Sequence, residues 1–218
     1  MKTIILIDDH PIMRHGLAQL IGMEEGLKVI GQAGSASEGL QFMEKRPVDL
    51  AIVDLTLPDR HGLELIKDIH AQHPSTRIIV LSMHEENLYA ERALRAGARG
   101  YVMKETAADT LVSAIRKVLD GGLYVSEAMA SRLLEQATGQ RGKGGAAGIE
   151  KLTDRELEVM QLIGQGKASK HIAESLNISA RTVEAHRAHL KEKLGLPDGA
   201  ALVRFAVQWV ENHHRAGV

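Results

Sequence analysis

The stretch Thr3-Ile-Ile-Leu-Ile-Asp-Asp9 determines how the first half of the chain folds, because an apolar, β-branched run ends directly in two carboxylates. Continuous apolar runs of this kind are typical of strands buried on both faces of a parallel sheet. Four more runs lie at 28–33, 50–53, 77–81 and 100–103, and amphipathic patterns separate them near 11–22, 37–45, 62–72, 86–96 and 107–120. The alternation predicts an α/β domain with five parallel strands and helices on both faces.

Charged and polar side chains stand where these strands end. Asp8 and Asp9 end the first run, Asp54 ends the third, and Ser82 and Lys104 end the fourth and fifth. Thr56 follows Asp54 by two residues. Since parallel strands end at one edge of the sheet, we expect these side chains to converge there.

Three neighbouring carboxylates raise one another's pKa unless a cation compensates their charge. Mg²⁺ suits such a set, because it takes one or two carboxylates together with other oxygen ligands. A carboxylate beside Mg²⁺ can act as a nucleophile and form an aspartyl-phosphate. Lys104 would then balance the charge of the phosphoryl oxygens, and Ser82 would donate a hydrogen bond to them. A single Asp at a strand end is usually a turn or cap residue, so the hypothesis depends on the whole set.

Composition limits the remaining possibilities. The 218 residues include 27 Lys and Arg against 28 Asp and Glu, a net charge of −1, so charge alone does not indicate a nucleic-acid partner. The chain has no cysteine, which excludes disulfides and thiolate chemistry. We expect no membrane span and a cytoplasmic protein, because no apolar run approaches the roughly 20 residues that cross a bilayer.

The chain divides at a glycine-rich stretch, residues 139–148, which is typical of a flexible tether. Beyond it, Thr153 and Glu156 form the pattern of a capping box at the start of a helix. Helices are expected near 168–176 and 180–194, joined by a turn at Asn177, and a fourth opens at Pro197 and Asp198. Two helices joined by so short a turn have helix-turn-helix architecture, in which the second helix enters the major groove of DNA.

Candidate DNA contacts separate by chemistry. Lys170, Thr182, Arg187 and Lys191 are suited to phosphates, Glu184 can accept from cytosine, and Ala185 and Ala188 can touch a thymine methyl group. Arg181 and His186 complete the candidate set. A charged helix face is often merely solvated, so this assignment needs support from the rest of the chain.

Residues 1–121 resemble the receiver domain of two-component response regulators. The matching segments are Ile7-Asp-Asp-His10, Asp54-Leu-Thr-Leu-Pro-Asp59 with Gly62, Leu81-Ser-Met83, and Ala96 through Lys104. The resemblance implies a flavodoxin-like (βα)5 fold with strand order 2-1-3-4-5 and makes Asp54 the phosphoacceptor. It places Mg²⁺ on Asp9, Asp54 and the Thr56 carbonyl, with Asp8 acting through water, and makes Ser82 and Tyr101 the switch pair. Many receivers have a proline after the lysine, but Glu105 follows Lys104 here, which leaves open whether that peptide bond is cis.

The second half resembles the LuxR-type helix-turn-helix. The matching segments are Leu152 to Val159, Gly166 to Ala173, Ser179 to His186 and Lys193 to Gly195. The whole chain is therefore similar to a NarL/FixJ-type response regulator, with a receiver at 1–121, a helix and linker at 122–149 and a DNA-binding domain at 150–218. The family implies a regulator that is phosphorylated by a sensor histidine kinase and binds double-stranded promoter DNA as a homodimer. The last helix would pair the two copies through Ala201, Leu202, Phe205, Ala206 and Trp209.

Two other functions compete with this interpretation. A Mg²⁺-dependent aspartyl-phosphate phosphatase of the haloacid-dehalogenase type would carry an acid where Thr56 stands, so we expect a regulator that at most dephosphorylates itself slowly. A DNA-binding regulator independent of phosphorylation, whose receiver only dimerises, is the other alternative; the complete acidic set argues against it.

Overall fold

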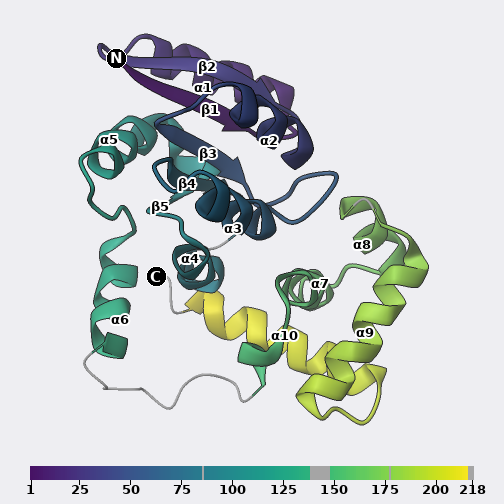
Figure 1. The fold of residues 1–218 in the computed structure, drawn as a ribbon. Coiled ribbons are helices and arrows are strands. Elements are labelled where there is room, and N and C mark those ends of the chain that lie inside the picture. The colour runs from purple at the N-terminus through teal and green to yellow at the C-terminus, as the bar shows by residue number, and fades with distance from the viewer. Residues whose placement is uncertain (85, 138–147, 177, 216–218) are drawn as a thin grey trace. The chain divides into compact units, whose positions relative to one another are not determined.

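The computed structural model describes residues 1–84, 86–137, 148–176 and 178–215, and the chain divides into two compact units between Gly139 and Gln140 (Figure 1). The expected turn residue Asn177 lies outside the described residues, as does the expected tether at 139–148 apart from Gly148. We therefore describe each unit by itself.

The first unit contains the predicted parallel sheet. Its strands are β1 (Lys2–Ile7), β2 (Leu27–Ala33), β3 (Leu50–Asp54), β4 (Arg77–Ser82) and β5 (Gly100–Met103). They pair in the order β2-β1-β3-β4-β5, and all four pairings are parallel. The flavodoxin-like order is thus confirmed, and every strand ends at the same edge of the sheet.

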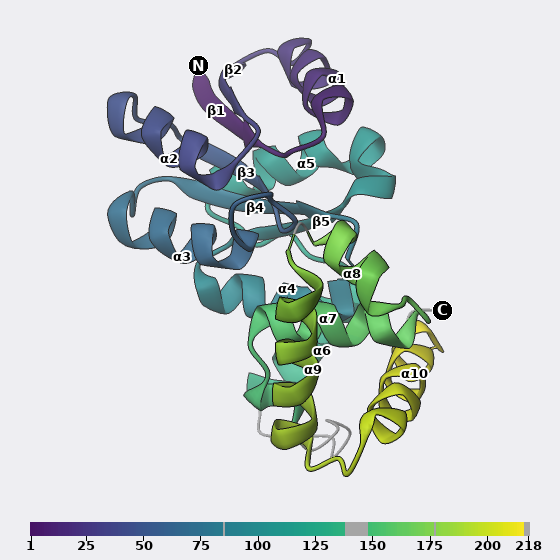
Figure 2. The ribbon, with the colours of Figure 1, turned by 90° about the vertical axis from the view of Figure 1, so that its right-hand side faces the viewer.

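Five helices follow the five strands in turn. They are α1 (Pro11–Gly22), α2 (Ala36–Lys45), α3 (Gly62–Gln72), α4 (Glu86–Ala96) and, after a single 3₁₀ turn at Lys104–Thr106, α5 (Ala107–Leu119). Figure 2 shows α1 and α5 on one side of the sheet and α2 and α3 on the other. On the first side, Leu17, Ile21 and Leu111 join Ile4 and Leu6 of β1 in one buried apolar cluster. Burial of this kind on both faces accounts for the nearly continuous apolar strands.

The first unit continues past α5. Tyr124 pairs with Gly100 of β5 in a parallel bridge, and α6 (Glu127–Ala137) follows and packs on α4. The peptide bond between Lys104 and Glu105 is trans.

The second unit is helical, as expected. A 3₁₀ turn at Ile149–Lys151 leads into α7 (Asp154–Gly164), α8 (Ser169–Ser175), α9 (Ala180–Leu194) and α10 (Gly199–Arg215). The Thr153–Glu156 capping box is present at the start of α7. Gly195, with φ of 65°, ends α9 in the left-handed conformation that glycine adopts without strain.

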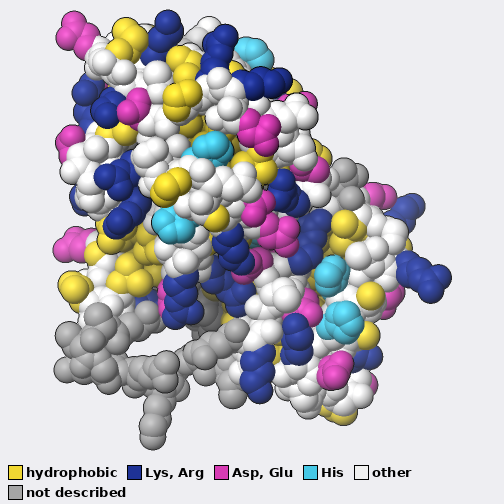
Figure 3. All heavy atoms as spheres, viewed as in Figure 1, with side chains coloured by type: hydrophobic (Ala, Val, Ile, Leu, Met, Phe, Trp, Pro, Cys, Tyr) yellow, Lys and Arg dark blue, Asp and Glu magenta, His cyan; other side chains and the backbone are white. Residues whose placement is uncertain are grey.

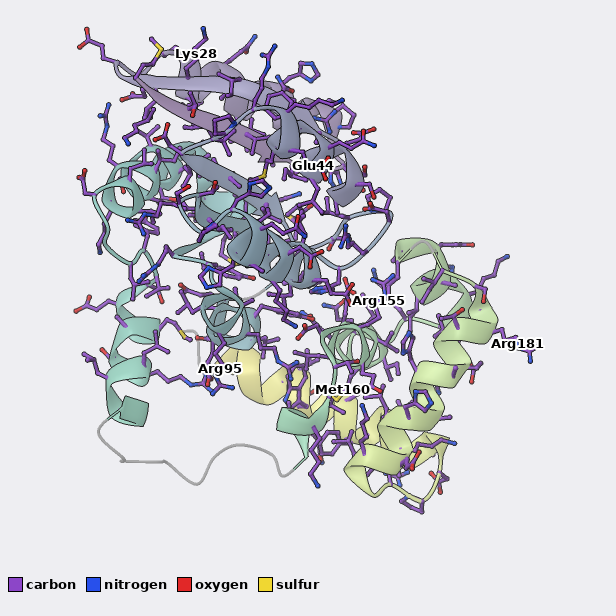
Figure 4. All side chains as sticks on the ribbon, in the orientation of Figure 1. Lys28, Glu44, Arg95, Arg155, Met160 and Arg181 are labelled. Carbon is purple, nitrogen blue, oxygen red and sulfur yellow. The ribbon has the colours of Figure 1, made fainter. Side chains whose placement is uncertain are left out.

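A small apolar core joins the four helices. Met160, which Figure 4 labels on α7, is buried, as are Ile172, Val183, Leu190 and Leu202. The Arg155 guanidinium donates to the buried Glu158 carboxylate over 2.7 Å and to the Leu176 carbonyl over 2.6 Å, and so ties α7 to the end of α8. Among the described residues, no helix is long and apolar enough to cross a membrane.

Candidate phosphorylation site and nucleic-acid interface

The strand ends bring one cation and two carboxylates into contact. Lys104 Nζ lies 2.7 Å from Asp54 Oδ2 and 2.8 Å from Asp8 Oδ2, and all three side chains are buried. The backbone N–H of Thr56 donates to Asp54 Oδ1 over 3.2 Å. Residues far apart in sequence thus meet because three parallel strands end together.

A glycine allows the loop after β3 to fold back on Asp54. A Cβ at Gly62 would collide with the Asp54 carbonyl oxygen and with Leu55 Cα, and the Gly62 N–H donates to Leu55 O over 2.8 Å. His61 caps α3 by accepting from the Leu63 N–H. The close approach keeps the chain that follows Asp54 tight against the strand.

Burial and the neighbouring charges set the pKa of Asp54. Burial raises the pKa of Asp54 to about 6, the nearby Lys104 ammonium opposes this rise, and the Asp8 carboxylate adds to it. Burial alone would lower the pKa of Lys104, but its contacts with Asp54 and Asp8 raise it above its ordinary value. Near neutral pH the site therefore holds a charged lysine and an ionised Asp54.

The acidic residues fit a hard divalent cation. Asp8, Asp9, His10 and Asp54 each offer a ligand atom, and these atoms lie within 4.8 Å of one another. Asp8 Oδ2 and Asp9 Oδ1 are buried and accept no well-oriented hydrogen bond, although Lys104 and His10 lie close to them. Carboxylates with spare acceptor capacity are oxygen ligands of the kind that Mg²⁺ prefers.

The expected switch residues are connected through His84, which sequence reasoning missed. Ser82 Oγ accepts from the His84 N–H over 3.0 Å, and the Tyr101 hydroxyl donates to the His84 carbonyl over 2.7 Å. The His84 ring lies 3.1 Å from Thr56 Oγ1, measured at Nε2, and stacks at a tilt on Tyr89 with ring centroids 4.7 Å apart. Tyr101 is 2% exposed, so its ring already occupies the inner position. The only sequence signal for His84 is its place two residues after Ser82.

Most of the candidate DNA contacts lie on one exposed side of the second unit. The exposed members are Lys170, Arg181, Thr182, Glu184, Ala185 and Ala188, whereas Arg187 and Lys191 are half-buried. Arg181 projects away from α9 (Figure 4). Glu184 accepts from Ser169 Oγ over 2.6 Å and lies 3.7 Å from Arg187 Nε, so both are already engaged within the unit. Basic and acidic side chains are interspersed over the face of this unit in Figure 3.

His186, the remaining candidate, is half-buried. Its Nδ1 atom is buried, and burial, with the nearby Arg155 guanidinium, lowers the pKa of His186. The ring therefore packs in part against the rest of the unit, and its contact with DNA stays a prediction.

The expected pairing residues of the last helix lie mostly inside the helical unit. Leu202 and Ala206 are fully buried, and α10 packs closely on α7 at Gly164. Ala201 and Trp209 are buried as well, and Phe205 is half-buried. The four buried residues therefore pack within a single copy of the chain, and their part in pairing stays a prediction. Val203 and Arg204 are exposed on the same helix.

Comparison with known families agrees with this geometry. Residues 4–116 match the family model described as the response regulator receiver domain, and residues 150–206 match that of the bacterial regulatory proteins of the luxR family. The chain is 39% identical to the transcriptional regulatory protein UhpA of Escherichia coli strain K12 over 204 residues, which are 94% of this chain and 97% of that protein. It is 36% identical to the nitrate/nitrite response regulator NarL of the same strain over 201 residues, 89% of each chain.

A solved structure agrees as well. RcsB from Salmonella enterica serovar Typhimurium, bound to the promoter rprA in the presence of the phosphomimetic BeF₃⁻, is similar with a TM-score of 0.62 and 28% identity. The match covers 94% of this chain and 98% of that chain. A receiver with a buried acidic site, followed by LuxR-type helices, defines a DNA-binding transcriptional regulator. The chain belongs to the two-component response regulators of the NarL/FixJ type.

Proposed function

We propose that Asp54 accepts a phosphoryl group from a sensor histidine kinase and that this modification controls the binding of α9 to promoter DNA. The buried contact of Lys104 with Asp54 and Asp8 is the observation that carries the proposal. A structural ion pair needs one carboxylate, whereas this lysine has two, and further acidic ligands lie beside them.

Each side chain of the site has a different role in the proposed phosphoryl transfer. An Asp54 carboxylate oxygen attacks phosphorus, and the bond from phosphorus to the donor breaks as the aspartyl-phosphate forms. Lys104 neutralises charge on the phosphoryl oxygens, and the Ser82 hydroxyl donates to one of them while still accepting from the His84 N–H. Asp9, Asp54 and the Thr56 carbonyl would hold Mg²⁺, with Asp8 assisting through water. When bound, Mg²⁺ supplies positive charge that offsets the carboxylates and the transferred group.

Loss of the phosphoryl group is proposed to be slow. Thr56 occupies the position where a phosphatase of this chemistry has an acid, and its hydroxyl is engaged with His84. A threonine is a poor general base, so the site favours one modification that persists over repeated turnover.

An apolar groove beside the site is suited to the phosphodonor protein. A cavity of about 510 Å³ is lined by Ile12, Met13, Leu17, Met83 and Lys104, together with His10 and Gly16. Ile12 is 90% exposed, which is unusual for so large an apolar side chain. We place the docking of the kinase here, so Ile12→Asp should slow transfer from the kinase and leave labelling by acetyl phosphate unchanged.

The helical unit is proposed to act at promoters in the cytoplasm as a homodimer. The proposed phosphate contacts are Lys170, Arg181 and Thr182. The proposed base contacts are Glu184 and the small residues Ala185 and Ala188. Additional positive charge comes from the half-buried Arg187 and Lys191. Pairing through the exposed side of α10, at Val203 and Arg204, leaves the core residues in place. In this proposal, the receiver spans residues 1–121, the linker spans 122–149 and the DNA-binding domain spans 150–218.

Labelling with acetyl phosphate and Mg²⁺ tests the proposal. Asp54→Asn should abolish labelling, while the control Asp68→Asn, which changes a surface carboxylate paired with Arg60, should label like the original protein. Undiminished labelling of Asp54→Asn would remove the proposed acceptor. If neither labelling nor Asp54→Asn alters DNA binding, the regulator is independent of phosphorylation.

A further inference from the structure

The chain after α5 turns back along the free edge of β5. Gly121 adopts a φ of 91°. Tyr124 then makes two backbone hydrogen bonds, to the residues on either side of Gly100. Its N–H donates to Arg99 O over 2.9 Å, and its carbonyl accepts from the Tyr101 N–H over 2.8 Å. Part of the segment expected to be linker is therefore bonded to the strand that carries the switch residue Tyr101.

The next helix is tied to α4 by two polar contacts. The Ser126 N–H donates to Glu86 Oε1 over 2.8 Å, and Arg132 Nη1 donates to the Asn87 carbonyl over 3.3 Å. Ser126 also caps α6, because its Oγ accepts from the Met129 N–H over 3.1 Å. Met129 is fully buried, so the first turn of α6 has an apolar anchor as well.

The contacts of α6 and the contacts of the phosphorylation site are made by one short segment. His84 bonds to Ser82 through its N–H and to Tyr101 through its carbonyl, and Glu86 and Asn87 hold α6 only two and three residues later. The described conformation of His84, Glu86 and Asn87 satisfies both sets of bonds at once. Anything that favours this conformation at Ser82 therefore also favours the contacts at Ser126 and Arg132.

We propose that Glu86 and Asn87 clasp α6 against the receiver and that phosphorylation of Asp54 tightens this clasp. The proposal rests on the function proposed above, because the phosphoryl group acts by fixing the Ser82 hydroxyl and, through it, His84. Since α6 is the last helix before residues 138–147, the clasp determines where the connection to the DNA-binding helices leaves the receiver. Coupling of this kind is reciprocal, so loosening α6 must weaken the modified state by the same factor.

Amide hydrogen exchange of the full-length chain tests the clasp, with BeF₃⁻ and Mg²⁺ as the phosphoryl mimic. Adding the mimic should slow exchange over residues 127–137 by roughly fivefold or more, the lower limit of ordinary allosteric coupling. Glu86→Ala should speed exchange of α6 without the mimic and weaken binding of BeF₃⁻ by a similar factor. Arg132→Ala removes the second contact and should act in the same direction. Glu24→Ala breaks an exposed pair with Arg116 elsewhere on the receiver and should change neither quantity.

The outcomes separate the two proposals. If the mimic protects the loop after Asp54 but leaves α6 exchange unchanged, the clasp is refuted and the phosphoacceptor assignment stands. Unchanged α6 exchange in both Glu86→Ala and Arg132→Ala also refutes the clasp. If the mimic protects neither the Asp54 loop nor α6, both proposals fail together.

Discussion

The Lys104 ammonium lies 2.7 Å from Asp54 Oδ2, although the two residues are 50 positions apart in the chain and both side chains are buried. The parallel order of β3, β4 and β5 creates this contact, because each strand delivers its last residues to the same edge. A buried charge of this kind is stable only with its partner in place.

Replacing the lysine should therefore damage both chemistry and stability. Lys104→Gln leaves Asp8 and Asp54 facing each other without a cation, and we expect labelling by acetyl phosphate to fall roughly tenfold or more. The free energy of unfolding without Mg²⁺ should fall by about 3 kcal/mol, as expected when a buried ion pair loses one member. Added Mg²⁺ should restore part of the stability but not the labelling. Full labelling of Lys104→Gln would show that the contact is only structural.

The pKa of Asp54 is a second test. In the metal-free protein, the ¹³C shift of the Asp54 carboxyl should titrate near pH 6, well above the ordinary value of 3.8. Because the shift is upward, the carboxyl is protonated below that pH and ionised above it, so the proposed attack on phosphorus should need the higher pH. Addition of Mg²⁺ should move the midpoint down, since a cation favours the charged form. A metal-free midpoint near 4 would contradict the burial that we describe.

Gly62 tests the close approach of the loop to Asp54. Gly62→Ala puts a methyl group against backbone atoms that cannot yield, so we expect a loss of about 1–3 kcal/mol in the free energy of unfolding. Gly16→Ala is the matched control, because a Cβ there meets nothing within 4 Å and lies in α1. That change should stabilise the protein by about 0.5–1 kcal/mol. Equal effects of the two substitutions would rule out a special constraint at Gly62.

The proposed phosphate contacts and the proposed base contact should affect DNA binding in different ways. Lys170→Ala and Arg181→Ala should each weaken binding to all DNA sequences alike and reduce the dependence of log K on log salt by about 1. Glu184→Ala should instead alter the preference at one base position. Binding isotherms at several salt concentrations distinguish these outcomes. A change in base preference on losing Lys170 would mean that this lysine reads sequence.

Local patterns in the sequence are sufficient to predict much of the fold. The apolar runs predicted every strand to within one residue, and the Thr153–Glu156 spacing predicted the cap of α7. The convergence of Asp8, Asp54 and Lys104 also followed from the rule that parallel strands end together.

Other features depend on contacts that no local pattern encodes. The central place of His84 arises from its backbone bonds to Ser82 and Tyr101, which any residue type could make. The pairing of Tyr124 with β5 depends on a turn at Gly121 that reverses the chain. The burial of Leu202 and Ala206 within the unit is not encoded locally either, because periodicity shows that a helix has an apolar face but not what covers it.

The central claim is that modification of Asp54 governs how the helical unit binds DNA. The most direct measurement is the affinity for genomic fragments selected by the protein, with and without BeF₃⁻ and Mg²⁺ at one fixed salt concentration. We predict that the mimic changes the affinity of the original chain and leaves that of Asp54→Asn unaltered. Equal affinities of the original chain with and without the mimic would contradict the claim.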